Sequence, residues 1–220
     1  GRSPAPAPTS TPRATGRTPA EPLAPSNRAG RGSPRAAPDP PVPRLLTVDD
    51  VPAGCHRLTD FDDAEANRRW VVVKDDVMGG QSLGALSSDA GVLLFRGNIN
   101  TDGGGFSSLR LPLDPEALVP YERIEFRARP DERTYMVTFD DAVASRDRRV
   151  SHRAPIEFET PGEWQTVSVS FDDLVPAIFG RPIDDLPFRK ELAARMGVMI
   201  SDGRDGPFRL EIDWIDLCPG

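Results

Sequence analysis

Apolar and polar side chains alternate with a period of two in four separate segments of this 220-residue chain. In the clearest segment Ile124, Phe126 and Ala128 stand between charged neighbours, and the segments 134–139, 166–171 and 208–214 repeat the pattern. A period of two places alternate side chains on opposite faces of a β-strand. Each segment is therefore predicted to be a strand with one buried face, and the core must be built from sheets.

Further segments have strand composition and lie between turns rich in Gly, Pro and Asp. One stretch, 187–195, has helical composition and opens with Pro187, so a short helix is predicted there. The expected fold is all-β, a β-sandwich or barrel. The further predicted strands are 56–61, 69–74, 83–88, 91–97, 105–111, 152–159 and 196–201.

Residues 1–43 differ from the rest of the chain in composition. They hold 12 of the 24 prolines and six arginines, but only two acids, Glu21 and Asp39. With so few apolar side chains this tail is predicted to be disordered, whereas residues 44–220 suit one domain. The tail resembles an organellar transit segment or its remnant, and a bacterial Pro/Ala linker behind a removed export signal is the alternative.

Charge and residue types exclude several classes of function. The tail is basic and the chain has a net charge of -7, so residues 44–220 are strongly acidic and should repel nucleic acid. The chain contains no run of 18 apolar residues, so no transmembrane helix is predicted. Two histidines, His56 and His152, are too few for a histidine-based zinc site, so no metal ligand or cofactor is predicted. The sequence leaves open whether the protein binds a structural calcium ion. Adjacent Asp residues in a strand point to opposite faces, so an Asp pair does not by itself form a chelating site.

Two adjacent glycines follow two carboxylates after the predicted strand 69–74. One interpretation is a loop that meets a ligand or protein partner, and the other is a tight turn whose Asp side chain accepts backbone N–H groups. Gly80 to Gly84 also fits the G-x-S-x-G pattern of a nucleophilic serine, but strand and turn residues follow instead of a helix. Ser82 is therefore not predicted to be catalytic. The residues of this loop are Asp75-Asp76-Val77-Met78-Gly79-Gly80-Gln81-Ser82.

A second glycine-rich loop lies at 101–107. Gly103, Gly104 and Gly105 could surround an anion, but Ser108 stands where a dinucleotide-binding pattern requires glycine. The loop is either a flexible hairpin entering the strand 105–111 or a binding loop at the same end of the sandwich as 75–82.

Cys55 and Cys218 lie just before the first predicted strand and at the end of the last. If these strands are antiparallel neighbours, the two thiols come within disulfide reach. The alternative, two unrelated half-buried thiols, is preferred because both residues lie at element ends.

The order of these motifs resembles the complex I intermediate-associated protein 30 family over roughly residues 56–217. The resemblance implies a galactose-binding-domain-like jelly-roll β-sandwich with no enzymatic step. Mitochondrial members act as assembly factors for respiratory complex I, and plastid members are linked to photosystem biogenesis. The matching residues are Trp70, Asp75 to Gly80, Ser82, Phe95, Gly97-Asn98, Gly104-Gly105-Phe106, Ser108, Arg110, Tyr135, Gly162 to Gln165 and Gly206 to Ile215.

The resemblance implies a non-catalytic assembly factor or accessory subunit that docks on protein subunits of a membrane electron-transfer complex. No small-molecule ligand is expected. An organelle, plastid ahead of mitochondrial matrix, is the expected compartment, and a bacterial cytoplasm or envelope is the alternative. The expected protein-binding residues are Asp75, Asp76, Met78, Gly79, Gly80, Ser82, Gly104, Gly105, Phe106 and Arg110.

A carbohydrate-binding module is the alternative function, because related jelly rolls bind sugars. Such sites present exposed aromatic rings. Trp70, Trp164 and Trp214 lie in strand patterns and are expected in the core, which weakens this alternative.

Overall fold

The computed structural model of the protein describes residues 51–145, 148–178, 180–184 and 186–220, without the side chains of 77–78, 141–145 and 148–149. The predicted tail 1–43 and the lead-in 44–50 lie outside the described residues.

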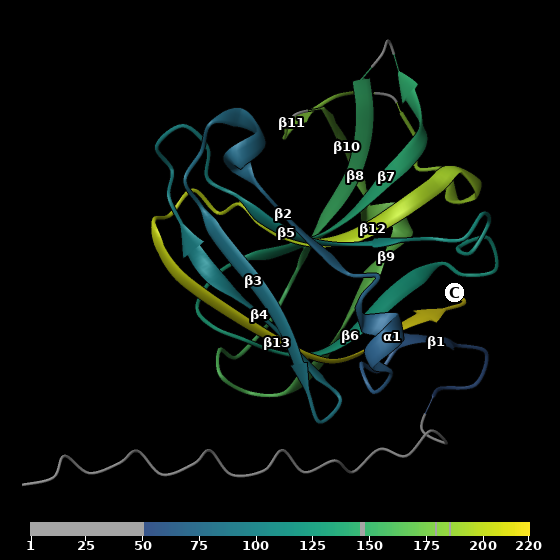
Figure 1. Cartoon of the computed structure of the whole chain (residues 1–220). Coiled ribbons are helices and arrows are strands. Elements are labelled where there is room, and N and C mark those ends of the chain that lie inside the picture. The colour runs from purple at the N-terminus through teal and green to yellow at the C-terminus, as the bar shows by residue number, and fades with distance from the viewer. Residues whose placement is uncertain (1–50, 146–147, 179, 185) are drawn as a thin grey trace, which may run out of the picture. The chain divides into compact units, whose positions relative to one another are not determined.

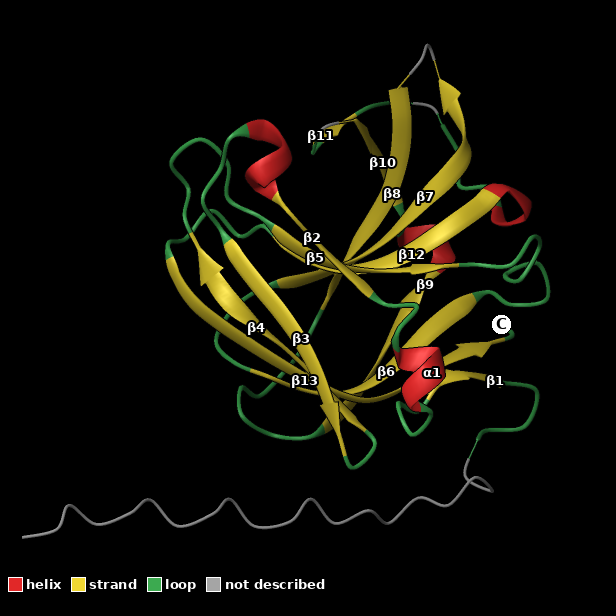
Figure 2. Ribbon diagram, viewed as in Figure 1, coloured by secondary structure: helices red, strands yellow, loops and turns green. Residues whose placement is uncertain are grey.

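Two antiparallel sheets face each other in a β-sandwich, as the strands in Figures 1 and 2 show. The six-stranded sheet has the order β3-β4-β13-β6-β9, and β1 pairs with β13. Its strands are β1 (His56–Thr59), β3 (Leu83–Asp89), β4 (Val92–Ile99), β6 (Arg123–Pro130), β9 (Gln165–Ser170) and β13 (Gly206–Cys218).

The seven-stranded sheet has the order β11-β10-β8-β7-β12-β5-β2. These two sheets confirm the predicted all-β sandwich. The strands of this sheet are β2 (Val71–Lys74), β5 (Ser107–Pro112), β7 (Tyr135–Ser145), β8 (Arg148–Ile156), β10 (Val175–Ile178), β11 (Arg181–Pro182) and β12 (Ala193–Ile200).

The core lies between the sheets and follows the period of two in the sequence. Phe126 on β6 and Val137 and Phe139 on β7 are fully buried, and their strand neighbours point outward. Burying such a side chain contributes roughly 1.5–3 kcal/mol, so the alternation fixes which face of each strand turns inward.

The helix predicted over 187–195 is wrong. The structure has only a 3-10 turn, η4 (Lys190–Leu192), before β12 begins at Ala193. β12 is hydrogen-bonded to β7 on one side and β5 on the other, and Met196, Val198 and Ile200 are buried. Pairing on both edges outweighs the helical propensity of Glu191 to Ala194, which is only a few tenths of a kcal/mol per residue.

The other described helices are short and were not predicted. They are α1 (Ala64–Asn67), which begins after the N-cap Asp63, and the 3-10 helices η2 (Asp75–Met78) and η3 (Phe171–Asp173). β10 and β11 were also missed, because Pro176 and Pro182 weaken their strand pattern. β11 is the edge strand of the seven-stranded sheet, where proline is tolerated, and β10 lies next to it, between β11 and β8.

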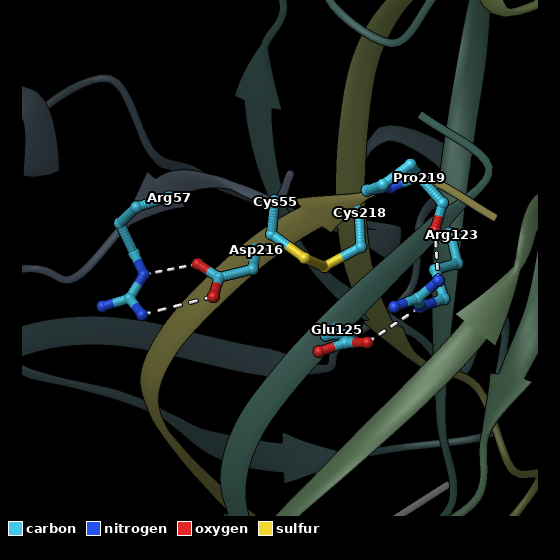
Figure 3. Close-up of a disulfide and its surroundings, with 7 residues drawn as sticks. All are labelled: Cys55, Arg57, Arg123, Glu125, Asp216, Cys218 and Pro219. Atoms are coloured by element: carbon cyan, nitrogen blue, oxygen red, sulfur yellow. Dashed lines mark hydrogen bonds and ion pairs between the residues drawn. A yellow bond between two sulfur atoms is a disulfide. The ribbon is translucent and has the colours of Figure 1, made fainter. Parts of the chain in front are cut away.

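The first and last strands of the domain are joined covalently. β1 pairs antiparallel with β13, and Cys55 and Cys218 form a disulfide, shown in Figure 3. The preference for two unrelated thiols was therefore wrong, because the antiparallel pairing of β1 with β13 places the two residues side by side.

The three tryptophans do not all lie in the core. Trp70 does, at 4% exposure. Trp214 is buried on the outward face of the six-stranded sheet, where the guanidinium of Arg57 lies 4.8 Å from its ring centre. Trp164 is half-buried on the same face beside Arg127 and Arg129. The expectation was wrong for these two because guanidinium groups cover the rings from outside.

Candidate functional site

The two predicted loops meet at the carboxylate of Asp75, the first residue of η2, which is fully buried. Asp75 Oδ1 accepts the backbone N–H of Ser82 at 3.0 Å. Asp75 Oδ2 accepts the Ser82 hydroxyl at 2.6 Å and the N–H groups of Gly105 and Phe106 at 2.6 and 3.4 Å. The Ser82 hydroxyl in turn accepts the N–H of Asn100 at 3.1 Å. These contacts place the loops 75–82 and 100–107 side by side.

The charge on Asp75 is stabilised by its donors. Burial raises the pKa of this carboxyl, but the hydrogen bonds from Ser82, Gly105 and Phe106 together outweigh it, so the pKa is lowered from its ordinary value. The ionised carboxylate thus holds four donors from two loops, and no cationic side chain of the described residues pairs with it.

The space around Asp75 requires glycine at two neighbouring positions. A Cβ on Gly80 would lie 2.3 Å from Cγ of Asp75, and a Cβ on Gly104 would lie 2.4 Å from its Oδ2. Gly79 has φ of 87°, a left-handed conformation that ends η2. The motif of acid and glycines is therefore a packing unit in which bare backbone surrounds a carboxylate.

A third segment joins the same end of the sandwich. Asp205, in the turn before β13, accepts the backbone N–H and the hydroxyl of Thr101 at 2.7 and 2.9 Å. These bonds tie the loop 100–107 to the turn 202–206. The bonds also explain why the pKa of Asp205 is lowered.

Arg133 organises the turn 202–206 and is 9% exposed. Its guanidinium pairs in two places with Asp202, at 2.7 Å each, and donates to the carbonyl groups of Arg204, Gly206 and Pro207. The hydrogen bond with Asp202 raises the pKa of Arg133. No sequence pattern singled out Arg133, Asp202 or Asp205 as site residues.

Tyr135 extends the network toward β7. Its buried hydroxyl donates to Asp131 Oδ1 at 2.9 Å, and Asp131 Oδ2 accepts the N–H of Arg209 at 2.6 Å. Burial first, and then the negative charge of Asp131, raise the pKa of Tyr135 above its ordinary value.

The expected protein-binding residues divide by exposure. Asp75, Ser82 and Gly105 are buried, so their side chains and backbone are used within the protein. Asp76, Gly79 and Gly104 are exposed, whereas Gly80 and Phe106 are half-buried. Met78 belongs to η2, and its side chain lies outside the described part of the structure.

Arg110 does not belong to this cluster of loops. It lies three residues into β5 and its guanidinium is 3.7 Å from Asp140 of β7, which also pairs with Arg195 of β12 at 3.1 Å. At about 3.3 Å per residue, Arg110 is roughly 10 Å along the strand from the loops. The Arg110 side chain lies on the outward face of the seven-stranded sheet.

The described residues contain no group of three or more His, Cys, Asp or Glu side chains arranged to hold a metal ion. Within the same part of the chain, no helix is long and apolar enough to cross a membrane.

Solved structures share this fold at low sequence identity. The family 11 carbohydrate-binding module of a cellulosomal cellulase of Clostridium thermocellum has a TM-score of 0.54 and 15% identity, over 76% of this chain and 95% of that one. The same kind of module in complex with a β-1,3-1,4-mixed-linked tetrasaccharide gives 0.53 and 16%, over 76% and 96%. These similarities establish the jelly-roll sandwich and nothing about a ligand.

A comparison with curated proteins finds no significant match. A family model nevertheless matches the part of the chain that contains Asp75 and Tyr135. Residues 59–212 match the family model described as Complex I intermediate-associated protein 30. The matched range runs from the end of β1 to the middle of β13 and includes every loop of the candidate site, so the chain belongs to the complex I intermediate-associated protein 30 family.

Proposed function

We propose that this protein is a non-catalytic assembly factor or accessory subunit that docks on subunits of a membrane electron-transfer complex, respiratory complex I or a photosystem. Membership of the complex I intermediate-associated protein 30 family carries the proposal. The family supports a role related to complex I assembly, and the docking itself is the step we add.

The loops held by Asp75 support a docking role. The hydrogen bonds of Asp75 and Asp205 bring the segments 75–82, 100–107 and 202–206 together before a partner arrives. Preorganised loops lose less conformational entropy on binding, which favours association. Asp76, whose side chain is 57% exposed, and the half-buried Phe106 are the proposed contact residues.

The alternative, a carbohydrate-binding module, has less support. The outward positions of β5, β7 and β12 carry Arg110, Met136, Thr138, Asp140 and Met199, and the described outward residues of the seven-stranded sheet include no Trp, Tyr or Phe. A sugar-stacking platform needs such rings. Trp214, on the other sheet, is only 6% exposed.

The disulfide bears on the compartment. Disulfides persist in oxidising environments and are rare where thiols are kept reduced. The Cys55–Cys218 bond therefore favours a plastid lumen or a bacterial envelope over a mitochondrial matrix or a cytoplasm.

Affinity purification from native membranes tests the proposal. The tagged full chain should recover subunits of an electron-transfer complex. The Asp76→Lys variant should recover several-fold less, whereas Asp173→Lys, an exposed site at the opposite end of the sandwich, should recover as much as the wild type. Recovery of the protein alone, or binding to a glycan panel in place of protein subunits, would contradict a docking role.

A further inference from the structure

The edge of the six-stranded sheet at β3 is open. β3 (Leu83–Asp89) is the first strand of that sheet and is paired with β4 on one side only. Among the described residues, no strand hydrogen-bonds to its other side. An unpaired edge presents a row of N–H and C=O groups to which another chain can bind.

This edge lacks the usual protection against strand pairing. Leu83 is 62% exposed, more than the other exposed large hydrophobic side chains of the described residues, and Ala85 and Ser87 are also exposed. β3 contains no proline or lysine, the residues that commonly block an edge. The opposite edge, β9, exposes Thr166 and Ser168 instead of an apolar side chain.

Neighbouring strands of the other sheet approach β3 from its core face. A Cβ on Gly84 would point toward that face and lie 2.1 Å from the Ser107 hydroxyl and 3.0 Å from Val72. Side chains stand roughly perpendicular to a sheet, so β5 and β2 lie beneath β3 and not in line with its edge. Near the end of the strand the Ser88 hydroxyl accepts the side-chain amide of Asn67 from α1 at 3.2 Å, whereas Leu83, Ala85 and Ser87 are exposed.

The surface beside the edge carries positive charge. Arg96 on β4 is exposed and stands directly opposite Ala85, with Arg209 of β13 on its other side. Arg209 pairs with Glu211 at 2.8 Å, but within the described part of the chain no acid pairs with Arg96. A shallow pocket of about 400 Å³ lies here, lined by Leu83, Ala85, Arg96, Pro207 and Arg209 among others.

The small side chain of Ala85 makes Arg96 available to an added strand. A residue paired with Ala85 from outside would lie two strand spacings from Arg96, about 9.6 Å. A long guanidinium side chain can extend over an alanine toward it, while Arg209 repels Arg96 from the other side. A carboxylate at that position would find an unpaired partner, and an apolar neighbour two residues away would lie beside Leu83.

We propose that the free edge of β3 binds an extended segment of a partner protein by strand addition, one that carries an acidic and an apolar residue two positions apart on the same face. This site deepens the docking function proposed above and rests on it. Main-chain hydrogen bonds to β3 supply affinity, and Arg96 with the exposed Leu83 selects the segment.

Hydrogen exchange with two synthetic peptides tests the site on the full-length protein. The Glu-Val probe is an acetylated and amidated peptide Thr-Val-Thr-Glu-Thr-Val-Thr, in which Glu and Val lie two residues apart on one face, and the Lys-Val control has Lys in place of Glu. The Glu-Val peptide should slow amide exchange in β3 and leave β9 unchanged, and it should bind at least tenfold more tightly than the Lys-Val peptide. Equal binding of both peptides, or protection absent from β3, would overturn the proposal.

Charge reversal separates specific from general effects. Arg96→Glu should reverse the preference and favour the Lys-Val peptide, whereas Arg189→Glu, an exposed arginine near η4, should bind as the wild type does. Unchanged preference in Arg96→Glu would refute the role of Arg96. Circular dichroism of both variants checks that they are folded.

The same variants keep this proposal distinct from the function on which it rests. If the wild type recovers complex subunits from membranes and Arg96→Glu recovers them equally, the edge is not the docking site while the docking function stands. If the wild type recovers no subunits but the Glu-Val peptide binds β3, the docking function fails while the edge site stands.

Discussion

At the scale of single residues, a buried carboxylate determines the shape of the predicted loops. Asp75 accepts donors from its own loop and from the loop 100–107, and glycine stands wherever a Cβ would strike it. The sequence left open whether this motif meets a partner or closes a turn. The structure gives Asp75 the second role, extended to a neighbouring loop, and in the proposed docking function partner contact falls to exposed residues such as Asp76.

Asp75→Asn should destabilise the protein by about 2 kcal/mol at pH 7, because the amide cannot accept from all four donors. Asp76→Asn, at an exposed pair with Lys74, should change stability by less than about 0.5 kcal/mol. The midpoint of urea unfolding measures both. Equal effects of the two variants would show that Asp75 does not join the loops.

The effect of Asp75→Asn should depend on pH. Because the pKa of Asp75 is lowered in the folded protein, its charge stabilises the fold above the unfolded pKa of about 3.9, and that contribution is lost as pH falls through the folded value. The stability difference between wild type and Asp75→Asn should therefore be constant above about pH 5 and shrink below about pH 4. A constant difference down to pH 2 would contradict this assignment.

At the scale of elements, an ion pair and the neighbouring disulfide stabilise the pairing of β1 with β13. The guanidinium of Arg57 pairs with both oxygens of Asp216, which is fully buried, and Figure 3 shows this pair beside the disulfide. Burial raises the pKa of Asp216 even though Arg57 opposes the shift. The carboxylate therefore depends on Arg57 to remain charged in the folded protein.

Arg57→Gln should destabilise the protein by about 3 kcal/mol at pH 7, since it leaves a buried carboxylate without its counter-ion. Adding Asp216→Asn should restore part of that loss. The loss should also shrink as pH falls toward about 4, because a group with a raised folded pKa favours the fold when protonated. Urea unfolding of the single and double variants between pH 4 and pH 7 provides the measurement, and additive effects would argue against the pair.

Elements also show where local reading of the sequence failed. The segments 123–129 and 166–171 appear within one residue of their predicted bounds as β6 and β9, whereas β7 and β13 extend several residues beyond the predicted 134–139 and 208–214. The segment 187–195 became a 3-10 turn and the start of β12, because hydrogen bonds from β7 and β5 and burial of Met196 decide its conformation. These partners are far away in sequence, so no local pattern could indicate them.

At the scale of the whole molecule, the disulfide closes the domain. Cys55 and Cys218 are 163 residues apart in sequence and join the first strand to the last. A link across so long a loop restricts the unfolded chain strongly, so its loss should be felt by the whole sandwich.

The double variant Cys55→Ser/Cys218→Ser should be about 3 kcal/mol less stable than the oxidised wild type. A dithiol reductant should lower the wild type to the same stability and leave the variant unchanged. Urea unfolding with and without reductant tests this. A wild type that is insensitive to reductant, with alkylatable thiols before reduction, would show that the bond is absent from the protein.

The alternation of apolar side chains by itself determined that the core is built from β-strands and which face of most strands is buried, because burial is a local property of a period-two pattern. The glycines and acids by themselves marked the loops 75–82 and 101–107. Only the tertiary structure decided that both loops share Asp75, that Asp205 and Arg133 hold the segment beside them, and that Arg110 lies elsewhere. It also decided the order of the strands and the open edge at β3. These depend on contacts between residues distant in the chain, whose pairing is set by the packing of the whole sandwich.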